Sequence, residues 1–364
     1  MRVLIAGGGT GGHLYPGIAL AREILSRDPE ANVSFVGTAA GIEARVVPLE
    51  GFSLDLMRVA GVKGRSLLER IRAVGLLPLS AIDAWRVVSR RRPEVVVGVG
   101  GYASGPVLVL AALRGLPTMV LEQNALPGLT NRLLARVVRA AAVTFEETLR
   151  FFPGAGFVAG NPVRPEFVSA GVRSRHDGVD SPPSAVRVLI FGGSQGAHAI
   201  NLAMVAAAPR LAAAGVDLAI THQTGQRDVD LVRRAYEQAG LAARVEAFLD
   251  QMASEMNQAD LIVCRAGATT IAELTTSARA AILVPLPTAA DDHQRKNAAV
   301  LARAGAADVI EQRDAAVDGL ADALLALARD PVRRARMSAA ARGLARPDAA
   351  ARIADRLWEL AGKR

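Results

Sequence analysis

The feature that most constrains the fold is an alternation of short Val- and Ile-rich runs with longer segments of helical period. Such runs are typical of strands buried on both faces of a parallel sheet, and the segments between them are typical of covering helices. The runs form two series: 3–6, 33–36, 95–99, 118–121 and 141–144, then 186–191, 217–221, 244–248, 260–264 and 281–284. The pattern predicts an α/β protein with two doubly wound, Rossmann-like parallel-sheet domains.

Each series opens with a strand that ends in glycines, at residues 7–9 and again at residues 192–193. Between the series, a Pro-rich and polar stretch from Pro162 to Ser184 is interpreted as an interdomain connection. We therefore expect a first domain over residues 1–162, a second over 163–341, and a C-terminal helix at about 342–364 that packs back on the first. Ligands of such sheets bind beyond the carboxyl ends of the strands, so the expected site is a cleft between the domains.

The chain has 364 residues and one cysteine, Cys264, which excludes an internal disulfide and fits a reducing compartment. Met1 leads directly into a strand and a glycine cluster, without the charged and apolar regions of a signal peptide. Residues 95–113 are long and uncharged enough to suggest a membrane span, but they contain four glycines and Pro106. We expect a strand, a loop and a helix there, in a cytoplasmic protein.

A glycine-rich loop at residues 7–13 follows the first strand and precedes a helix. Three of its glycines satisfy the dinucleotide pattern GxGxxG, but a nicotinamide or flavin site also requires an acid at the end of the second strand. The second strand ends at Thr38 and the next acid is Glu43, so the dinucleotide interpretation is disfavoured. His13 closes the loop. It is either a structural histidine or, as we favour, a general base, because imidazole has a pKa near neutrality.

Two further turns of this kind occur in the second half. Residues 192–197 bring backbone N–H groups, the Ser194 hydroxyl and a helix N-terminus near one point, an arrangement that accepts phosphate. Residues 264–273 again have the pattern of a strand, a glycine turn and a helix start. Glu273 falls about one turn into that helix, where a carboxylate can bind two ribose hydroxyls. The alternative is a first-turn acid that complements the helix dipole.

No pattern indicates a metal. Asp228 and Asp230 have the Asp-x-Asp spacing of metal-dependent sugar-nucleotide enzymes, but residues two apart in a helix point to different faces, so we interpret the pair as surface. The other histidines are scattered along the chain. A reaction on a phosphorylated substrate, without a metal or cofactor, fits these residues best.

Seven short motifs occur in order along nearly the whole chain. The N-terminal motifs are GGTGGH (8–13), GGYASGP (100–106), EQNALPGLTNR (122–132) and GNPVR (160–164). The C-terminal motifs are GGSQGA (192–197), CRAGATTIAE (264–273) and DHQ (292–294). Together they resemble the MurG family of N-acetylglucosaminyltransferases, which have the two-domain GT-B fold and make lipid II in peptidoglycan synthesis. The chain departs from the family at Leu121, at residues 278–280, and beside Gln294, where a second glutamine is common but His293 and Arg295 stand here.

The resemblance implies where UDP-GlcNAc binds. Leu249 matches the position whose backbone meets the uracil, and Glu273 matches the ribose ligand. Arg164, Ser194 and the turn at 268–270 are expected around the diphosphate. The full set of implied donor-binding residues is Thr10, Gly11, Gly12, Asn124, Arg164, Ser194, Leu249, Ala268, Thr269, Thr270, Ile271, Ala272, Glu273 and Gln294.

The implied reaction transfers GlcNAc from UDP-GlcNAc to the C4 hydroxyl of the muramoyl sugar in undecaprenyl-diphospho-MurNAc-pentapeptide (lipid I), with inversion to a β-1,4 linkage. His13 is the expected catalytic residue and takes the hydroxyl proton while UDP leaves toward Arg164 and two helix N-termini. Those fixed positive charges would replace a metal, so no cofactor is expected.

Residues 61–92 carry eight basic side chains against two carboxylates. The basic residues are Lys63, Arg65, Arg70, Arg72, Arg86, Arg90, Arg91 and Arg92, and the interleaved apolar residues are Leu67, Leu68, Ile71, Leu76, Leu77, Leu79, Ile82 and Trp85. Basic and apolar residues in this arrangement are typical of a surface that inserts into an anionic membrane leaflet. The segment therefore predicts a peripheral protein on the cytoplasmic face of the cell membrane. An ordinary half-buried amphipathic helix is the alternative. Nucleic acid is disfavoured because Trp85 is the one aromatic residue available for stacking.

Two other functions stay open. A nucleotide-sugar-binding or membrane-adaptor protein would keep the glycine turns and lack turnover. A UDP-GlcNAc 2-epimerase shares the fold but does not need the GGYASGP and EQNALPGLTNR loops. The presence of His13, Asn124, Arg164, Glu273 and Gln294 favours the transferase.

Overall fold

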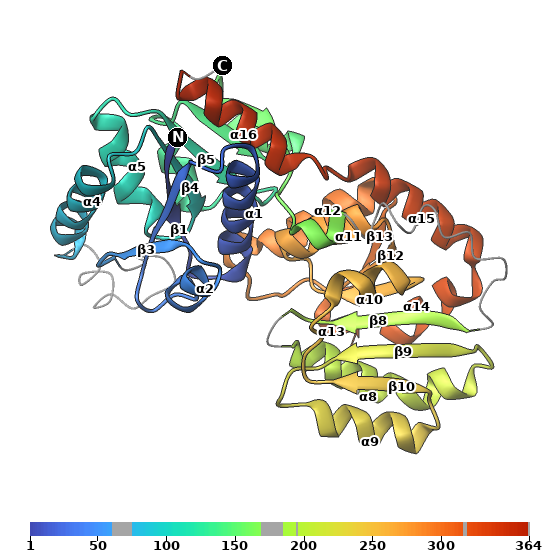
Figure 1. Ribbon diagram of the computed structural model, residues 1–364. Helices are drawn as coiled ribbons and strands as arrows, with labels where there is room; N and C mark the ends of the chain where they lie inside the picture. The colour runs from blue at the N-terminus through green and yellow to red at the C-terminus, as the bar shows by residue number, and fades with distance from the viewer. Residues whose placement is uncertain (60–74, 169–184, 194–195, 316–318, 363–364) are drawn as a thin grey trace. The chain divides into compact units, whose positions relative to one another are not determined.

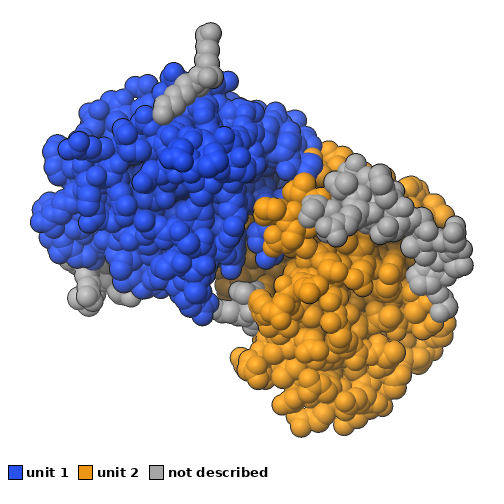
Figure 2. Space-filling view, viewed as in Figure 1, with its two compact units in different colours: residues 1–164, 346–364 blue, residues 165–345 orange. Residues whose placement is uncertain are grey.

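The computed structural model describes residues 1–59, 75–168, 185–193, 196–315 and 319–362. The chain forms two compact units, Met1–Arg164 with Arg346–Arg364, and Pro165–Ala345 (Figure 2). Most of the predicted interdomain connection falls on residues 169–184 and lies outside the described residues.

Seven parallel strands form the sheet of the first unit (Figure 1). They are β1 (Arg2–Gly7), β2 (Asn32–Gly37), β3 (Ser53–Leu56), β4 (Val95–Gly100), β5 (Thr118–Glu122), β6 (Ala140–Val143) and β7 (Gly156–Val158). The order across the sheet is β3-β2-β1-β4-β5-β6-β7, so the chain winds from β1 to one edge and then from β4 to the other. The carboxyl ends of β1 and β4 therefore meet at a topological switch point, where α/β sheets bind ligands.

Helices cover both faces of this sheet. The described helices are α1 (Gly11–Arg27), α2 (Glu43–Leu49), α4 (Leu77–Arg91), α5 (Ser104–Leu113), α6 (Leu129–Leu134) and α16 (Ala349–Leu360), with the 3-10 helix η1 (Glu146–Phe151). On one face α1 packs beside α16 (Figure 1), and Ile5 shares a core with Ile353. On the other face lie α4 and α5, and Leu4 shares a core with Leu108. Because neighbouring residues of a strand point to opposite faces, β1 needs an uninterrupted apolar run.

Six parallel strands form the sheet of the second unit, in the order β10-β9-β8-β11-β12-β13. They are β8 (Val186–Phe191), β9 (Leu218–Gln223), β10 (Ala243–Glu246), β11 (Leu261–Cys264), β12 (Ala280–Leu283) and β13 (Ala307–Val309). The described helices are α8 (His198–Ala213), α9 (Val229–Ala239), α10 (Met252–Gln258), α11 (Ala268–Ser277), α12 (His293–Arg303), α13 (Gln312–Asp314), α14 (Leu320–Arg329) and α15 (Pro331–Leu344), with the 3-10 turn η2 (Ala290–Asp292). Here the switch point lies at the carboxyl ends of β8 and β11.

The prediction of two doubly wound α/β units is confirmed, and each predicted strand overlaps an observed one. The sequence pattern does not predict β3, β7 and β13. All three are edge strands of three or four residues, and most of their positions are half-buried or exposed. They therefore lack the continuous apolar run of the central strands.

Residues 95–113 form β4, a turn and α5, as predicted. Within the described part of the chain, no helix has the length and apolar character needed to cross a bilayer. Near the C-terminus, α15 ends at Leu344 and α16 begins at Ala349, because Pro347 stands between them and cannot continue a helix. The structure groups α15 with the second unit and α16 with the first.

Candidate active site

Two glycine turns meet at the switch point of the first unit. Residues 7–12 span the end of β1 and the start of α1, and Gly100 ends β4 with Gly101 directly after it. The Gly8 N–H donates to the Gly100 carbonyl at 3.2 Å, and a Cβ on Gly101 would stand 2.5 Å from the Gly8 carbonyl oxygen. Because these backbones approach more closely than a side chain allows, glycine is required at the contact.

His13 lies in the first turn of α1, half-buried, with its ring against Gly100. Its Nδ1 lies 3.3 Å from Oε1 of Gln123, a buried residue that follows β5. The predicted donor residues 10–12 form the same turn, in which the Thr10 carbonyl accepts the His13 N–H at 3.2 Å. The structure therefore gathers the predicted base and these donor residues at one point of the first unit.

Glu43, at the start of α2, is buried and turns toward the glycine loop. Its carboxylate accepts the Gly9 N–H at 2.7 Å, the Thr38 N–H at 2.8 Å and the Thr38 hydroxyl at 2.9 Å. Gly8, Gly37 and Gly41 pack so closely on this carboxylate that a Cβ on any of them would clash with it. Glu43 therefore holds the loop in place and does not serve as the ribose ligand of a dinucleotide site.

Glu122, the last residue of β5, holds the loop that carries Asn124. Its carboxylate accepts both the backbone and the side-chain N–H of Asn124, the Gly128 N–H and Nδ2–H of Asn131. Burial raises the pKa of Glu122, and the four hydrogen bonds act in the opposite direction. Asn124 is thereby fixed at the same end of the sheet as His13.

Arg164 is the last residue of the first unit before the chain enters the second. Its guanidinium carbon lies 5.7 Å from the centroid of the Tyr15 ring, a cation–π distance. Tyr15 belongs to α1 and stands two residues after His13, so Arg164 lies near the turn that carries the predicted base.

In the second unit, the predicted diphosphate turn follows β8; its Ser194 lies outside the described residues. Gly193 and Gly196 have positive φ, and the Gly196 N–H donates to the Gly193 carbonyl at 2.9 Å. Gln223, buried at the end of β9, donates from Nε2 to the same carbonyl at 2.9 Å and accepts the Leu249 N–H with Oε1 at 3.0 Å. One side chain thus connects the predicted diphosphate turn with the predicted uracil contact.

The N-terminus of α11 forms where the sequence predicts it, with residues 268–270 in the first turn. Ile271 and Ala272 are buried in its apolar side, and Glu273 is 7% exposed. Burial, followed by the charge of Glu273, raises the pKa of the Cys264 thiol to about 12. The negative charge of Glu273 therefore lies near the carboxyl end of β11. The N-terminus of α11, which carries the positive end of the helix dipole, lies at the same place.

Gln294 is the second residue of α12, and its Oε1 accepts the Leu286 N–H at 3.0 Å. Its neighbour Arg295, one of the departures from the family pattern, forms a bidentate pair with Glu311, with Nε and Nη2 each 2.8 Å from a carboxylate oxygen. The pair raises the pKa of Arg295 and lowers that of Glu311. Arg295 therefore forms an ion pair with Glu311 at the surface.

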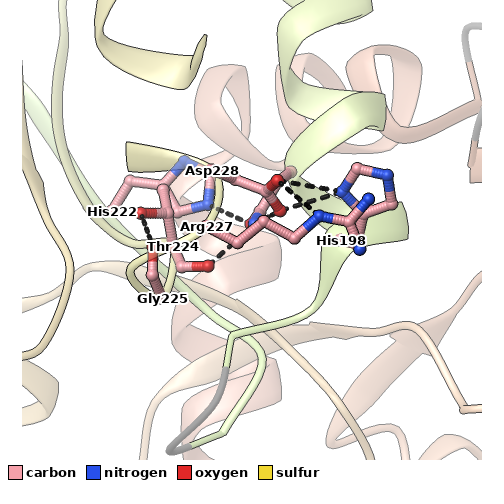
Figure 3. Close-up of polar contacts among 7 residues, drawn as sticks. His198, His222, Thr224, Gly225, Arg227 and Asp228 are labelled. Atoms are coloured by element: carbon pink, nitrogen blue, oxygen red, sulfur yellow. Dashed lines mark hydrogen bonds and ion pairs between the residues drawn. The ribbon is translucent and has the colours of Figure 1, made fainter. Parts of the chain in front are cut away.

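A polar network lies between the end of β9 and the first turn of α8 (Figure 3). Asp228 accepts Nδ1–H of His198 at 2.9 Å and Nδ2–H of Asn201 at 2.8 Å. Burial opposes ionisation of Asp228, but these hydrogen bonds outweigh it and lower the pKa. The interpretation of Asp228 and Asp230 as a surface pair is correct for Asp230, whose side chain is 75% exposed. It is wrong for Asp228, which is buried as the N-cap residue of α9.

His222 is the buried histidine of this network (Figure 3). Asn201 donates from Nδ2 to the Thr224 carbonyl at 2.9 Å, so its Oδ1 faces Nε2 of His222 at 3.1 Å and must accept from it. Nδ1 of His222 then accepts from the Tyr236 hydroxyl at 2.9 Å. Burial lowers the pKa of His222 to about 3, so the ring is neutral.

The first unit also carries a cavity of about 720 Å³ beside α6 and η1. Four arginines line it, and no carboxylate is among its described lining residues: Arg132, Arg136, Arg139 and Arg150. The Arg150 guanidinium lies 4.9 Å from the centroid of the Phe151 ring. A concave surface of this charge attracts anions.

Sequence reasoning misses three residues that support the predicted site: Glu43, Gln123 and Gln223. Gln123 directly follows β5 and Gln223 is the last residue of β9, and both are buried, so each polar side chain has to find partners within the protein. That position is the signal that could have identified them. The contact that makes Glu43 part of the site is its bond to Gly9, 34 residues away, and no local pattern indicates that bond.

Residues 3–143 match the glycosyltransferase family 28 N-terminal domain, and residues 187–353 match the glycosyltransferase family 28 C-terminal domain. The two units with their glycine turns thus define a glycosyltransferase of the two-domain GT-B class. A curated protein of Anaeromyxobacter dehalogenans (strain 2CP-C), named "UDP-N-acetylglucosamine--N-acetylmuramyl-(pentapeptide) pyrophosphoryl-undecaprenol N-acetylglucosamine transferase", is 49% identical over 100% of this chain and 94% of its own length. The chain belongs to the MurG family.

Further relatives agree. A protein of the same name from Pelobacter propionicus is 48% identical over 98% of this chain and 99% of its own length. The crystal structure of Acinetobacter baumannii MurG is similar with a TM-score of 0.81 and 31% identity, over 98% of this chain and 99% of that chain. A UDP-GlcNAc 2-epimerase from Neisseria meningitidis bound to UDP-GlcNAc has a TM-score of 0.67 at 12% identity, over 99% of this chain and 100% of that chain, which is a likeness of fold alone.

Proposed function

We propose that this protein transfers GlcNAc from UDP-GlcNAc to the C4 hydroxyl of MurNAc in undecaprenyl-diphospho-MurNAc-pentapeptide, with inversion to a β-1,4 linkage. The product is lipid II, so the protein serves peptidoglycan synthesis and through it cell-wall growth, shape and division. The observation that carries the proposal is 49% identity, over the whole chain, to an enzyme named for this transfer. The epimerase alternative rests on 12% identity and is not supported.

Donor binding is assigned to the second unit. Glu273 accepts two ribose hydroxyls, and the Leu249 backbone meets the uracil. The diphosphate lies against the first turns of α8 and α11, where the N–H groups of a helix start favour negative charge. Ser194 and residues 268–272 line that position, and Gln294 lies by the sugar. Gln223 supports this assignment because it braces the turn and Leu249 together.

Acceptor activation is assigned to the first unit. His13 takes the proton of the C4 hydroxyl as the C4 oxygen bonds to the anomeric carbon. The bond from that carbon to the β-phosphate oxygen breaks, and UDP leaves with the electron pair. Arg164 and the two helix N-termini stabilise the departing charge, and Asn124 with residues 10–12 positions the sugar. The half-buried turn that carries His13, braced by Gly100 and Gln123, supports this role.

Membrane attachment is assigned to the outer surface of α4 and α5, which pack against each other. The alternative of an ordinary amphipathic helix accounts for Val87 and Val88, which are buried, but not for the apolar residues that these helices expose. The exposed apolar residues are Leu77, Leu79, Ile82 and Trp85 of α4, with Val109 and Leu113 of α5. The Arg86 and Arg90 side chains are 71% and 66% exposed along the same helix. Residues 61–74 of the predicted segment lie outside the described residues.

We therefore propose a peripheral protein on the cytoplasmic face of the membrane, bound to anionic lipid by apolar insertion and positive charge. The four arginines of the cavity add to that charge, since α6 packs on α5. Lipid I is confined to the membrane, so a surface of this kind brings the enzyme to its acceptor.

The direct test incubates the purified chain with labelled UDP-GlcNAc and a lipid I analogue, beside a His13→Ala variant. Transfer by the wild type, lost in the variant by about 10²–10⁴-fold while UDP-GlcNAc binding is retained, supports both the reaction and the base. No transfer by the wild type, with an acceptor that another enzyme accepts, would leave a nucleotide-sugar-binding protein.

A further inference from the structure

Gln123 makes two contacts that together fix the direction of its side-chain amide. It is 2% exposed and follows β5. Its Nε2 donates to the Val99 carbonyl at 3.0 Å, and its Oε1 lies 3.3 Å from Nδ1 of His13. Val99 is in β4, so the amide spans from one strand end to the first turn of α1.

The direction of the amide determines which nitrogen of His13 carries a proton. A backbone carbonyl only accepts, so the NH2 group of Gln123 must face Val99 and its oxygen must face His13. An amide oxygen also only accepts, so Nδ1 of His13 must be the donor. In the neutral ring the lone pair then lies on Nε2.

We propose that Gln123 is a positioning residue that holds neutral His13 as the Nδ1–H tautomer and makes Nε2 the atom that receives the acceptor proton. A neutral histidine in water prefers the opposite tautomer, in which the proton is on Nε2. In that tautomer Nε2 has no free lone pair and cannot accept a proton. Gly100 completes the arrangement, because a Cβ there would stand 2.6 Å from Nδ1, so only glycine leaves room for the ring beside the strand end. The catalytic use of this tautomer rests on the proposed transferase function; the tautomer itself does not.

The choice of an amide over a carboxylate at this position matters. In a serine-protease triad the partner of Nδ1–H is a carboxylate, which also stabilises the protonated ring. Here the neighbouring carboxylate, Glu122, accepts from four donors in the loop that follows it and in α6, and the neutral Gln123 faces His13. Gln123 therefore orients the base without adding a negative charge beside it.

The test is nitrogen NMR of the full chain labelled with 15N-histidine, at a pH where the rings are neutral. The chain has five histidines, and a His13→Asn variant identifies the His13 signals. We expect His13 as Nδ1–H in the wild type. A Gln123→Met variant, which keeps the length and loses the acceptor, is expected to move His13 toward Nε2–H. A Gln123→Glu variant, whose carboxylate accepts, is expected to keep Nδ1–H.

His222 is the internal control, because its contacts require the opposite tautomer, Nε2–H, in every variant. Unchanged His222 signals and unchanged UDP-GlcNAc binding show that the second unit is intact. In transfer assays Gln123→Met is expected to lower kcat by up to about 10²-fold, because the base is misoriented, with little change in the KM for UDP-GlcNAc. A wild-type His13 in the Nε2–H form, or a Gln123→Met variant that stays Nδ1–H, would overturn the proposal even if transfer occurs. The absence of any transfer by the wild type would instead refute the proposed function and leave the tautomer result standing.

Discussion

The carboxylate of Glu43 accepts the backbone N–H of Gly9 at 2.7 Å, across 34 residues of sequence. The same carboxylate holds Thr38 at the end of β2, so the loop that leads to His13 is anchored to a neighbouring strand. Catalysis by a general base depends on its placement to within a fraction of an ångström. Glu43 is therefore part of the support of the active site although it stands outside every recognised motif.

Replacing Glu43 tests that support. Glu43→Ala leaves the Gly9 and Thr38 N–H groups without their acceptor, at a cost of about 1–3 kcal/mol in the free energy of unfolding. Because the loop is released, transfer is expected to fall by about 10²-fold. UDP binding by the second unit, measured calorimetrically, is expected to be unchanged. Glu30→Ala, at an exposed position, is the matched control; full activity in Glu43→Ala would contradict the anchoring role.

A methyl group at Gly100 is expected to displace the base. The Cβ of Gly100→Ala would stand 2.6 Å from Nδ1 of His13, and the residue has φ of +97°. Gly115→Ala is the matched control, since Gly115 has φ of +73° but a Cβ there would meet no atom within 4 Å. Both variants share the penalty of about 1 kcal/mol for left-handed backbone, and the Gly100 variant alone is expected to lose transfer. Equal activities would show that the ring contact is unimportant.

Removing the charge of Glu273 is expected to weaken nucleotide binding. A hydrogen bond to a charged group contributes about 1.5–3 kcal/mol, so Glu273→Gln is expected to raise the Kd for UDP by about 10- to 150-fold. Calorimetric titration with UDP measures this without the acceptor. Glu237→Gln, at an exposed position of α9, serves as the control. A Glu273→Gln variant that binds UDP like the wild type would remove Glu273 from the ribose site.

The exposed face of α4 is expected to insert into anionic bilayers. Ile82→Glu places a charge among apolar residues and should reduce sedimentation with vesicles that contain an anionic phospholipid. Val332→Glu is the control, because Val332 is also an exposed apolar residue but lies in the second unit. A blue shift of Trp85 fluorescence on vesicle addition, in a Trp358→Phe background, would report insertion directly. Equal vesicle binding by both charge variants would exclude this surface.

The buried His222 predicts that the second unit loses stability in mild acid. Its pKa is about 3 in the fold and near 6.5 when unfolded, so below pH 6.5 the unfolded chain binds a proton that the fold does not. Stability is therefore full above pH 6.5 and falls as the pH drops toward 3, by about 2 kcal/mol at pH 5.

Amide hydrogen exchange in β8 and β9, corrected for intrinsic rates, measures this dependence. His222→Gln is less stable overall because His222 bonds both Asn201 and Tyr236. Its stability is nevertheless expected to vary less between pH 6.5 and 5. An equally steep dependence in that variant would place the acid sensitivity elsewhere.

The sequence predicts a structural feature well when the residues that cause it are neighbours in the chain. The central strands and the helix starts after residues 7–12 and 264–267 follow from apolar runs and glycine turns, which are local patterns. Edge strands such as β3 form because a neighbour supplies hydrogen bonds, and no local pattern indicates them. The same holds for Asp228, whose burial is set by His198 and Asn201, 30 and 27 residues away.

The candidate site shows the same division. Motif residues such as His13 and Glu273 are identifiable because they lie at glycine turns and helix starts, which are local sequence patterns. Their supports, Gln123 for the base and Glu43 for the loop, are defined by partners distant in the sequence, His13 and Gly9. The sequence therefore predicts reacting groups better than the side chains that orient them.

The position of α16 at the end of the chain determines the order in which the two units can fold during synthesis. Ile353 and Leu357, from the last turns of the chain, complete the core on the α1 face of the first sheet, while the whole second unit is encoded between Arg164 and Arg346. A ribosome has therefore released every residue of the second unit before the first can bury that face. During synthesis the second unit is the first to be complete, and the unit that carries the N-terminus is the last.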